Sequence, residues 1–252
     1  TKVGENHYGY NDFAFDISKY LTCDGTTENV ISVKVVHQTP SSRWYSGSGI
    51  YRDVELIVTD AVHVSRNGTY VTTPNLATEK DGDVTVKVQT DVQNDSSAQA
   101  AAQIRTTVLD AEGKAVSKAV TTDVTLAANS TAEKEQTLKV NKPALWSTEN
   151  PNLYYVQTEV LVGGKVKDTY KTTYGFRYIN FDANTGFSLN GKNVKLKGVC
   201  MHHDQGALGA EAWESAIDRQ VKILKEMGCN SIRVTHNPAA DELIEACNEQ
   251  GI

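Results

Sequence analysis

Residues 194–238 read VKLKGVCMHHDQGALGAEAWESAIDRQVKILKEMGCNSIRVTHNP and contain the change of pattern that decides the fold. Residues 194–199 predict a strand, and a helix is expected over 210–227. Within that helix, the apolar residues are spaced to form one stripe and Gly228 is placed to end it. The residues of the stripe are Trp213, Ile217, Val221, Leu224 and Met227.

A second strand and a second helix are expected after this one. Residues 230–234 predict the strand, Pro238 suits the first turn of the helix, and Gly251 would close it. Strand, helix, strand, helix is typical of a parallel α/β sheet. Because a complete (β/α)8 barrel takes about 250 residues, residues 182–252 are predicted to be only the N-terminal part of one.

The residues before this stretch, from 61 to 181, show strand patterns only. Valines at 84, 86, 88 and 92 alternate with polar residues, as in a half-buried strand. Gly163-Gly164 supplies the positive φ of a two-residue hairpin. Further strands are predicted at 104–108, 120–126, 133–140, 153–162 and 166–172. Six or seven short strands in about 120 residues indicate an immunoglobulin-like β-sandwich.

Residues 1–60 also predict strands, at 31–35 and 51–58. The segment is too short for a sandwich of its own, which usually takes about 100 residues. It is therefore expected to be the C-terminal part of a larger β-domain. The predicted fold class is multidomain and mainly β.

Composition excludes several classes of function. The chain has 25 Lys and Arg against 31 Asp and Glu, a net charge of −6, and no basic cluster. This balance predicts no nucleic-acid partner and no membrane surface. No apolar run approaches the roughly 20 residues of a membrane span. The four cysteines lack metal-site spacing and are expected to be free thiols. The compartment stays open between the cytoplasm and export or the cell surface.

Polar residues follow both strands of the predicted parallel sheet. They are Cys200-Met201-His202-His203-Asp204 and Arg233-Val234-Thr235-His236-Asn237-Pro238. Because functional residues gather at the carboxyl ends of parallel strands, the two clusters are expected to converge on one rim. The hypothesis is a polar pocket for a hydroxyl-rich ligand, with Arg233 orienting a carboxylate by paired hydrogen bonds.

Other interpretations of these residues stay open. His202, His203 and Asp204 are metal-ligand types, but adjacent histidines on a strand point to opposite faces, so no metal site is predicted. A histidine with a structural hydrogen bond is a further alternative. Arg43-Trp44-Tyr45 is a second candidate site, because aromatic residues beside Arg43 suit either contact with a sugar or partner, or core packing.

The motifs resemble glycoside hydrolase family 2. Residues 10–18 and 48–54 (SGIYRDV) look like the close of its sugar-binding jelly-roll domain. Residues 145–154 (LWSTENPNLY) and 174–177 (YGFR) look like the end of its immunoglobulin-like domain. Residues 197–204 and 230–238 resemble its first two barrel strands. The resemblance implies three parts: a partial jelly roll (1–60), the sandwich (61–181) and a truncated barrel (182–252).

The resemblance also implies a function. The β-galactosidase branch is the most similar, so the expected substrate is a terminal β-galactoside, hydrolysed with retention by two carboxylates. Arg233 would hold the nucleophile carboxylate, His202 and His236 would contact sugar hydroxyls, and Asn237, His203, Asp204 and Arg43 are further substrate-binding candidates. The family's two catalytic glutamates match no motif here, so no catalytic residue is assigned and the chain alone is expected to be inactive. No cofactor is expected, although a divalent or sodium ion in the full-length parent and a homo-oligomer are left open.

Three rival hypotheses remain. The first is a β-glucuronidase or β-mannosidase of the same family. The second is a non-catalytic carbohydrate-binding or adhesive β-module, which leaves the α/β tail unexplained. The third is a two-domain α/β enzyme complete as given, for which no acid and base pair stands out. Under the leading hypothesis the tail beyond residue 182 is expected to be unstable, because one βαβα unit leaves sheet edges unpaired.

Overall fold

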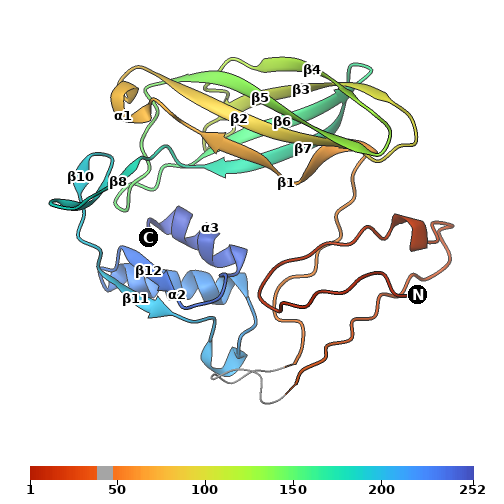
Figure 1. The fold of residues 1–252 in the computed structure, drawn as a ribbon. Coiled ribbons are helices and arrows are strands. Elements are labelled where there is room, and N and C mark those ends of the chain that lie inside the picture. Colours follow the sequence, from red (N-terminus) through yellow and green to blue (C-terminus); the bar gives the residue numbers. More distant parts are fainter. Residues whose placement is uncertain (39–47) are drawn as a thin grey trace.

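The computed structural model describes residues 1–38 and 48–252. Figure 1 shows three parts: a β-sandwich, an α/β unit below it, and an extended N-terminal segment beside the α/β unit. The polypeptide passes from the N-terminal segment into the sandwich and from the sandwich into the α/β unit. The sequence prediction of a mainly β chain, with a sandwich followed by the first units of a barrel, is confirmed.

The sandwich consists of two antiparallel sheets with the strand orders β1-β2-β5 and β4-β3-β6-β7. The strands predicted between residues 84 and 172 are confirmed, with shifts of a few residues at their ends. A short helix, α1 (Leu76–Glu79), follows the first strand. The strands are β1 (Val62–Thr72), β2 (Asp83–Asn94), β3 (Ala100–Leu109), β4 (Val120–Leu126), β5 (Ser130–Asn141), β6 (Tyr154–Val162) and β7 (Lys165–Tyr174).

Alternation in the sequence becomes alternation of burial. Every second residue of β2 is buried, beginning at Val84, and the residues between face outward. The β6–β7 hairpin turns at Gly163 and Gly164, whose φ angles of 59° and 78° suit glycine. The inner faces of the two sheets therefore pack together and form the hydrophobic core.

The core has one aromatic centre and one polar centre. Phe176 is fully buried and meets Tyr154 and Tyr174 edge to face, at ring-centroid distances of 4.9 and 5.2 Å. Gln136, also buried, donates from Nε2 to the Ile104 carbonyl at 3.0 Å and accepts from Thr106 Oγ1 at 2.6 Å. Because its amide is paired on both sides, Gln136 can stay buried without a large desolvation cost.

The strands predicted at 31–35 and 51–58 are wrong. The described residues of the N-terminal segment contain one 3-10 turn, η1 (Ser18–Tyr20), and otherwise an extended chain. Apolar side chains there stay in solvent; Ile31 is 69% exposed and Val54 is 78% exposed. A strand must pair its backbone groups with a neighbour, and the described residues provide no pairing strand for this segment.

The α/β unit contains the predicted parallel strand pair. A small sheet comes first, with order β10-β9-β8 and a turn at Asn190 and Gly191. The strands β11 and β12 then pair in parallel, and α2 packs against α3. The bounds are β8 (Ile179–Asp182), β9 (Gly186–Leu189), β10 (Lys192–Asn193), β11 (Gly198–Met201), η2 (Gly206–Leu208), α2 (Glu214–Glu226), β12 (Ser231–Val234) and α3 (Asp241–Gln250).

Several predicted bounds in this unit are wrong by three or four residues. The first strand begins at Gly198 rather than 194, and α2 begins at Glu214 rather than 210, because Trp213 is still extended with a ψ angle of 113°. Pro238 precedes α3 and does not lie in its first turn, since Ala240 is still extended. Gly228 and Gly251, with φ angles of 88° and 79°, follow the ends of their helices as predicted.

The predicted apolar stripe of α2 is only partly buried. Ile217 and Val221 pack in the core shared with α3. Trp213 and Met227, at the two ends of the stripe, are 53% and 69% exposed. Among the described residues, α3 is the helix that covers this face, and it covers only the middle of the stripe.

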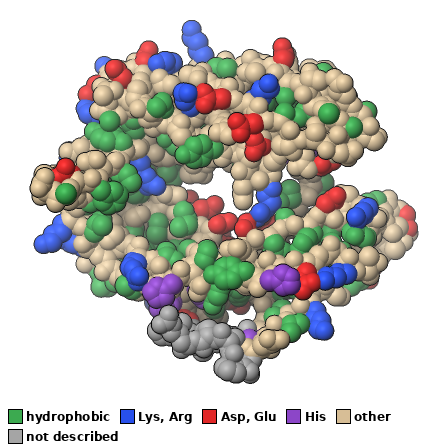
Figure 2. Space-filling view, in the orientation of Figure 1, with side chains coloured by type: hydrophobic (Ala, Val, Ile, Leu, Met, Phe, Trp, Pro, Cys, Tyr) green, Lys and Arg blue, Asp and Glu red, His purple; other side chains and the backbone are tan. Residues whose placement is uncertain are grey.

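A seam joins the sandwich to the α/β unit. Trp146 Nε1 donates to the Asn248 carbonyl of α3 at 2.7 Å. Lys225 Nζ of α2 donates to the Gly251 carbonyl at 2.6 Å and also to the Thr148 carbonyl. Figure 2 shows an opening between the sandwich and the two lower parts, so the seam holds the α/β unit along one side.

The four cysteines are free, as predicted. Cys23 and Cys200 are exposed, whereas burial raises the pKa of the Cys247 thiol to about 11. Within residues 1–38 and 48–252, no helix has the length and apolar character that crossing a membrane requires.

Candidate functional site

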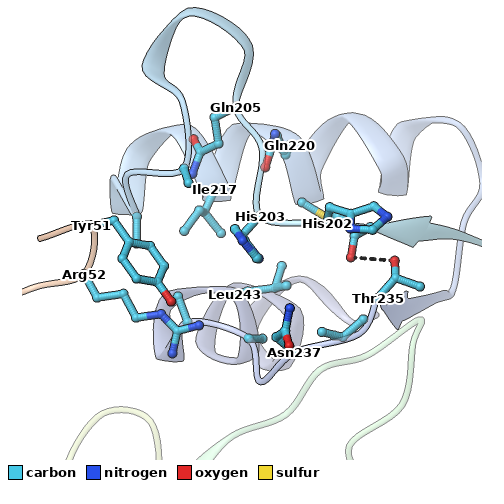
Figure 3. Close-up of a pocket in the computed structure, with 16 residues that line it drawn as sticks. Tyr51, Arg52, His202, His203, Gln205, Ile217, Gln220, Thr235, Asn237 and Leu243 are labelled. Atoms are coloured by element: carbon cyan, nitrogen blue, oxygen red, sulfur yellow. Dashed lines mark hydrogen bonds between the residues drawn. The ribbon is translucent and has the colours of Figure 1, made fainter. Parts of the chain in front are cut away.

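The two predicted polar clusters lie at one edge of the parallel pair. Cys200 of β11 is opposite Arg233 of β12, so the residues that follow each strand leave the sheet at the same end. Thr235 holds the two strand ends together, because its amide and its Oγ1 both donate to the Met201 carbonyl, at 3.0 and 3.1 Å. Figure 3 shows the second of these bonds.

The adjacent histidines point to different sides of this edge. The His202 ring meets the His236 ring at a centroid distance of 6.0 Å and an interplanar angle of 86°. The His203 ring lies instead 5.4 Å from the Tyr10 ring and 6.0 Å from the Tyr51 ring. Figure 3 shows His203 directed toward the cavity and His202 directed away from it. The site therefore has an outer face with two exposed histidines and an inner face with one half-buried histidine.

Arg233 lies on the sheet beside the outer face. Its side chain is exposed, and Nη1 is 3.8 Å from Cys200 Sγ. Among residues 1–38 and 48–252, no carboxylate oxygen lies within 4 Å of the guanidinium. The guanidinium therefore has no carboxylate partner among these residues, and its donors other than the one shared with Cys200 can bind a carboxylate.

The remaining predicted residues have different surroundings. Asn237 Oδ1 accepts a hydrogen bond from Tyr8 Oη at 3.2 Å. Asp204 is exposed, and its backbone carbonyl accepts from Gln220 Nε2 at 3.3 Å. Arg43 lies outside the described residues. No group of three or more His, Cys, Asp or Glu side chains in the described part of the chain could hold a metal ion.

A small cavity lies beneath the inner face. It has a volume of about 30 Å³ and is lined by His203, Thr235 and residues of α2 and α3. Gln205 Oε1 and Gln220 Oε1 are buried at its wall and accept no hydrogen bond from the described residues. Because small-molecule sites usually measure about 300 Å³ or more, this cavity is far too small for a sugar.

Sequence reasoning missed the contribution of the N-terminal segment. Tyr8, Tyr10, Tyr51 and Arg52 contact the inner face or the loop after β12. Tyr51 and Arg52 belong to the SGIYRDV motif, for which the sequence indicates only a place at the close of the jelly-roll part, residues 1–60. The closely spaced tyrosines beside an arginine were the available signal, but no local pattern says what they contact.

The environment of His203 makes the docking of this segment dependent on pH. Burial of the ring, and then the positive charges of Arg52 and His202, hold its pKa below the ordinary value of 6.5. The undocked state therefore takes up the proton more readily, so the contribution of His203 to docking is present above about pH 6.5 and is lost as the pH falls below it.

We expect the Ala212 amide, which donates to the Tyr51 carbonyl, to show this effect in hydrogen exchange. Its protection factor should fall between pH 7.5 and pH 5.5, and His203→Gln should flatten the dependence. His7→Gln is the control, because the His7 side chain is 86% exposed. An equal loss of protection in both variants would contradict the assignment to His203.

The fold and the site together define a class of protein. A sandwich that leads into parallel β/α units, with polar residues at the carboxyl ends of the strands, is typical of enzymes built on a (β/α)8 barrel. Residues 62–177 match the family model for glycosyl hydrolases family 2, and residues 183–252 match the model for the TIM barrel domain of that family. The chain belongs to glycosyl hydrolase family 2.

Individual relatives agree with this assignment. The chain is 40% identical to beta-galactosidase BoGH2A of Bacteroides ovatus over its whole length, which is 29% of that protein. It is 28% identical to a beta-glucuronidase of Bacteroides fragilis over 99% of the chain and 36% of the relative. The crystal structure of a family 2 member from Bacteroides cellulosilyticus matches 99% of the chain with a TM-score of 0.87 and 35% identity, over 34% of that structure. The chain thus spans about a third of the length of these relatives.

Proposed function

We propose that the protein is a retaining β-glycosidase that hydrolyses terminal β-galactosides, and that these 252 residues supply substrate-binding groups and not the catalytic carboxylates. The observation that supports this proposal is the outer face of the site. There Arg233, His202 and His236 gather at the carboxyl ends of two parallel strands. The name of the Bacteroides ovatus relative favours a galactoside as substrate.

The proposed chemistry follows from the residue types. A retaining glycosidase needs two carboxyl groups about 5–5.5 Å apart, one to attack the anomeric carbon and one to act as acid and then base. In this proposal the Arg233 guanidinium binds the attacking carboxylate, keeps it ionised and fixes its direction. His202 and His236 donate to or accept from sugar hydroxyls. Both carboxyl groups come from residues outside these 252, and the reaction requires no cofactor.

Hydrolysis of aryl glycosides tests the proposal. The full-length product of the gene and the 252-residue chain are each assayed with chromogenic β-galactoside, β-glucuronide and β-mannoside. We expect the full-length product to cleave the galactoside with the highest kcat/KM and the 252-residue chain to show no turnover. Turnover by the purified 252-residue chain would overturn the assignment of the carboxylates to residues outside it.

A second candidate substrate is a β-glucuronide, because a relative and a solved structure of 29% identity carry the name beta-glucuronidase. A glucuronide bears a carboxylate that a galactoside lacks. A higher kcat/KM for the glucuronide than for the galactoside would select this candidate. Sugar binding by the full-length product without any hydrolysis would instead select a non-catalytic carbohydrate-binding protein.

A further inference from the structure

Arg52 connects two segments that are far apart in the sequence. Its Nη1 donates to the Tyr10 carbonyl at 3.1 Å, and its Nη2 donates to the Pro238 carbonyl at 2.5 Å. Pro238 directly follows His236 and Asn237 in the loop after β12. One guanidinium therefore joins the N-terminal segment to the loop that holds two residues of the proposed sugar site. Figure 3 shows the Arg52 side chain extending toward this loop, which contains Asn237.

Neighbouring contacts fix the position of Arg52 itself. The adjacent Tyr51 donates from Oη to the Gly9 carbonyl at 2.7 Å, and its own carbonyl accepts from the Ala212 amide at 2.8 Å. Tyr8 Oη then reaches the same loop by donating to Asn237 Oδ1 at 3.2 Å. The N-terminal segment and the loop after β12 are thus each held by a further contact. The Arg52 guanidinium connects these two segments.

We propose that Arg52 is a positioning residue, which sets the place of His236 and Asn237 by holding the loop of residues 235–238 against the N-terminal segment. The chemistry suits arginine, because a planar guanidinium presents its donors in a fixed fork and can serve two carbonyls at once. A lysine ammonium is a single flexible point charge and fixes this geometry poorly. The inference rests on the proposed glycosidase function for its consequence in catalysis, but its structural part stands on the contacts alone.

The expected consequence is kinetic. A shift of about 1 Å in a group that contacts the substrate can lower the rate by about 10²-fold. Loss of the Arg52 bridge removes one of the contacts that hold the loop, beside those of Tyr8 and Thr235, without removing any group from the site. We therefore expect kcat/KM of the full-length product to fall by about 10- to 100-fold in Arg52→Ala, mostly through kcat, with smaller losses in Arg52→Lys.

The first test measures hydrogen exchange in the 252-residue chain. Protection of the Ala212 and Thr235 amides, which donate to the Tyr51 and Met201 carbonyls, should fall in Arg52→Ala. Arg66→Ala is the matched control, because Arg66 is exposed and pairs with Asp12 of the N-terminal segment at 2.5 Å, without a bond to the loop. Equal loss of protection in the two variants would contradict the proposal that Arg52 holds the loop against the N-terminal segment. If Arg52→Ala does not fold, Arg52→Lys gives the same comparison.

The second test measures kcat and KM of the full-length product with an aryl β-galactoside. Arg52→Ala should lose about 10- to 100-fold in kcat/KM, and Arg66→Ala should stay within about twofold of the unmodified protein. If Arg52→Ala lowers the amide protection but leaves kcat and KM unchanged, Arg52 does not position the site for catalysis. Absence of turnover in the unmodified full-length product would overturn the proposed function instead, and hydrogen exchange would then decide the bridge by itself.

Discussion

Arg233→Met in the full-length gene product is expected to lower kcat/KM for an aryl β-galactoside by about 10²–10³-fold, the effect usual for losing one group that stabilises charge during the reaction. The guanidinium of Arg233 is exposed at the strand end, and the hydrogen bond that it makes there is from Nη1 to Cys200 Sγ at 3.8 Å, which leaves its other donors for a carboxylate. Methionine keeps much of the side-chain length and removes both the charge and the paired donors.

The same substitution is also expected to change the pH dependence of kcat/KM in a definite direction. A cation beside a carboxylate lowers its pKa by about 1–3 units, so its removal should raise the pKa of the attacking group. The acidic limb of the kcat/KM profile should therefore move to higher pH in Arg233→Met and much less in Arg233→Lys, which keeps the charge. Arg219→Met is the control, because Arg219 is exposed on α2. An unchanged profile would show that Arg233 does not contact the nucleophile.

Phe176→Ala is expected to lower the free energy of unfolding of the 252-residue chain by about 3–5 kcal/mol. Phe176 is fully buried and holds two tyrosine rings in edge-to-face contact, so its loss leaves a cavity between the sheets. Urea denaturation followed by circular dichroism measures the change. Phe181→Ala is the matched control, because Phe181 is 72% exposed, and it should cost about 1 kcal/mol or less. Equal effects would mean that Phe176 does not support the sandwich core.

Most of the sandwich and the order of the α/β elements could be predicted from the sequence, because their patterns are local. The alternating valines of β2 and the glycine pair at 163–164 each specify a structure within a few residues. The same kind of pattern gave a wrong prediction at 31–35, where alternation is present but the described residues provide no strand to pair with it. Alternation of apolar and polar residues indicates which side of a strand is apolar. Whether the strand pairs depends instead on residues elsewhere in the chain.

In the candidate site, too, the features with a local sequence pattern could be predicted and the contacts between distant residues could not. Placing both polar clusters at one rim required only the parallel order of two strands, and the opposite directions of His202 and His203 required only strand geometry. The bridge from Arg52 to Pro238 spans 186 residues. No periodicity or spacing encodes such a contact, so the role of the N-terminal segment emerged only from the structure.

The seam between the sandwich and the α/β unit provides an optical signal of its own. Trp146 is buried there, with its indole nitrogen bonded to Asn248 and the Arg177 guanidinium 4.4 Å from its ring. Separation of the two parts would expose this indole to water and move its fluorescence emission to longer wavelength. In a chain whose Trp44 and Trp213 are replaced by phenylalanine, emission from Trp146 alone would follow opening of the seam in real time, without an attached dye.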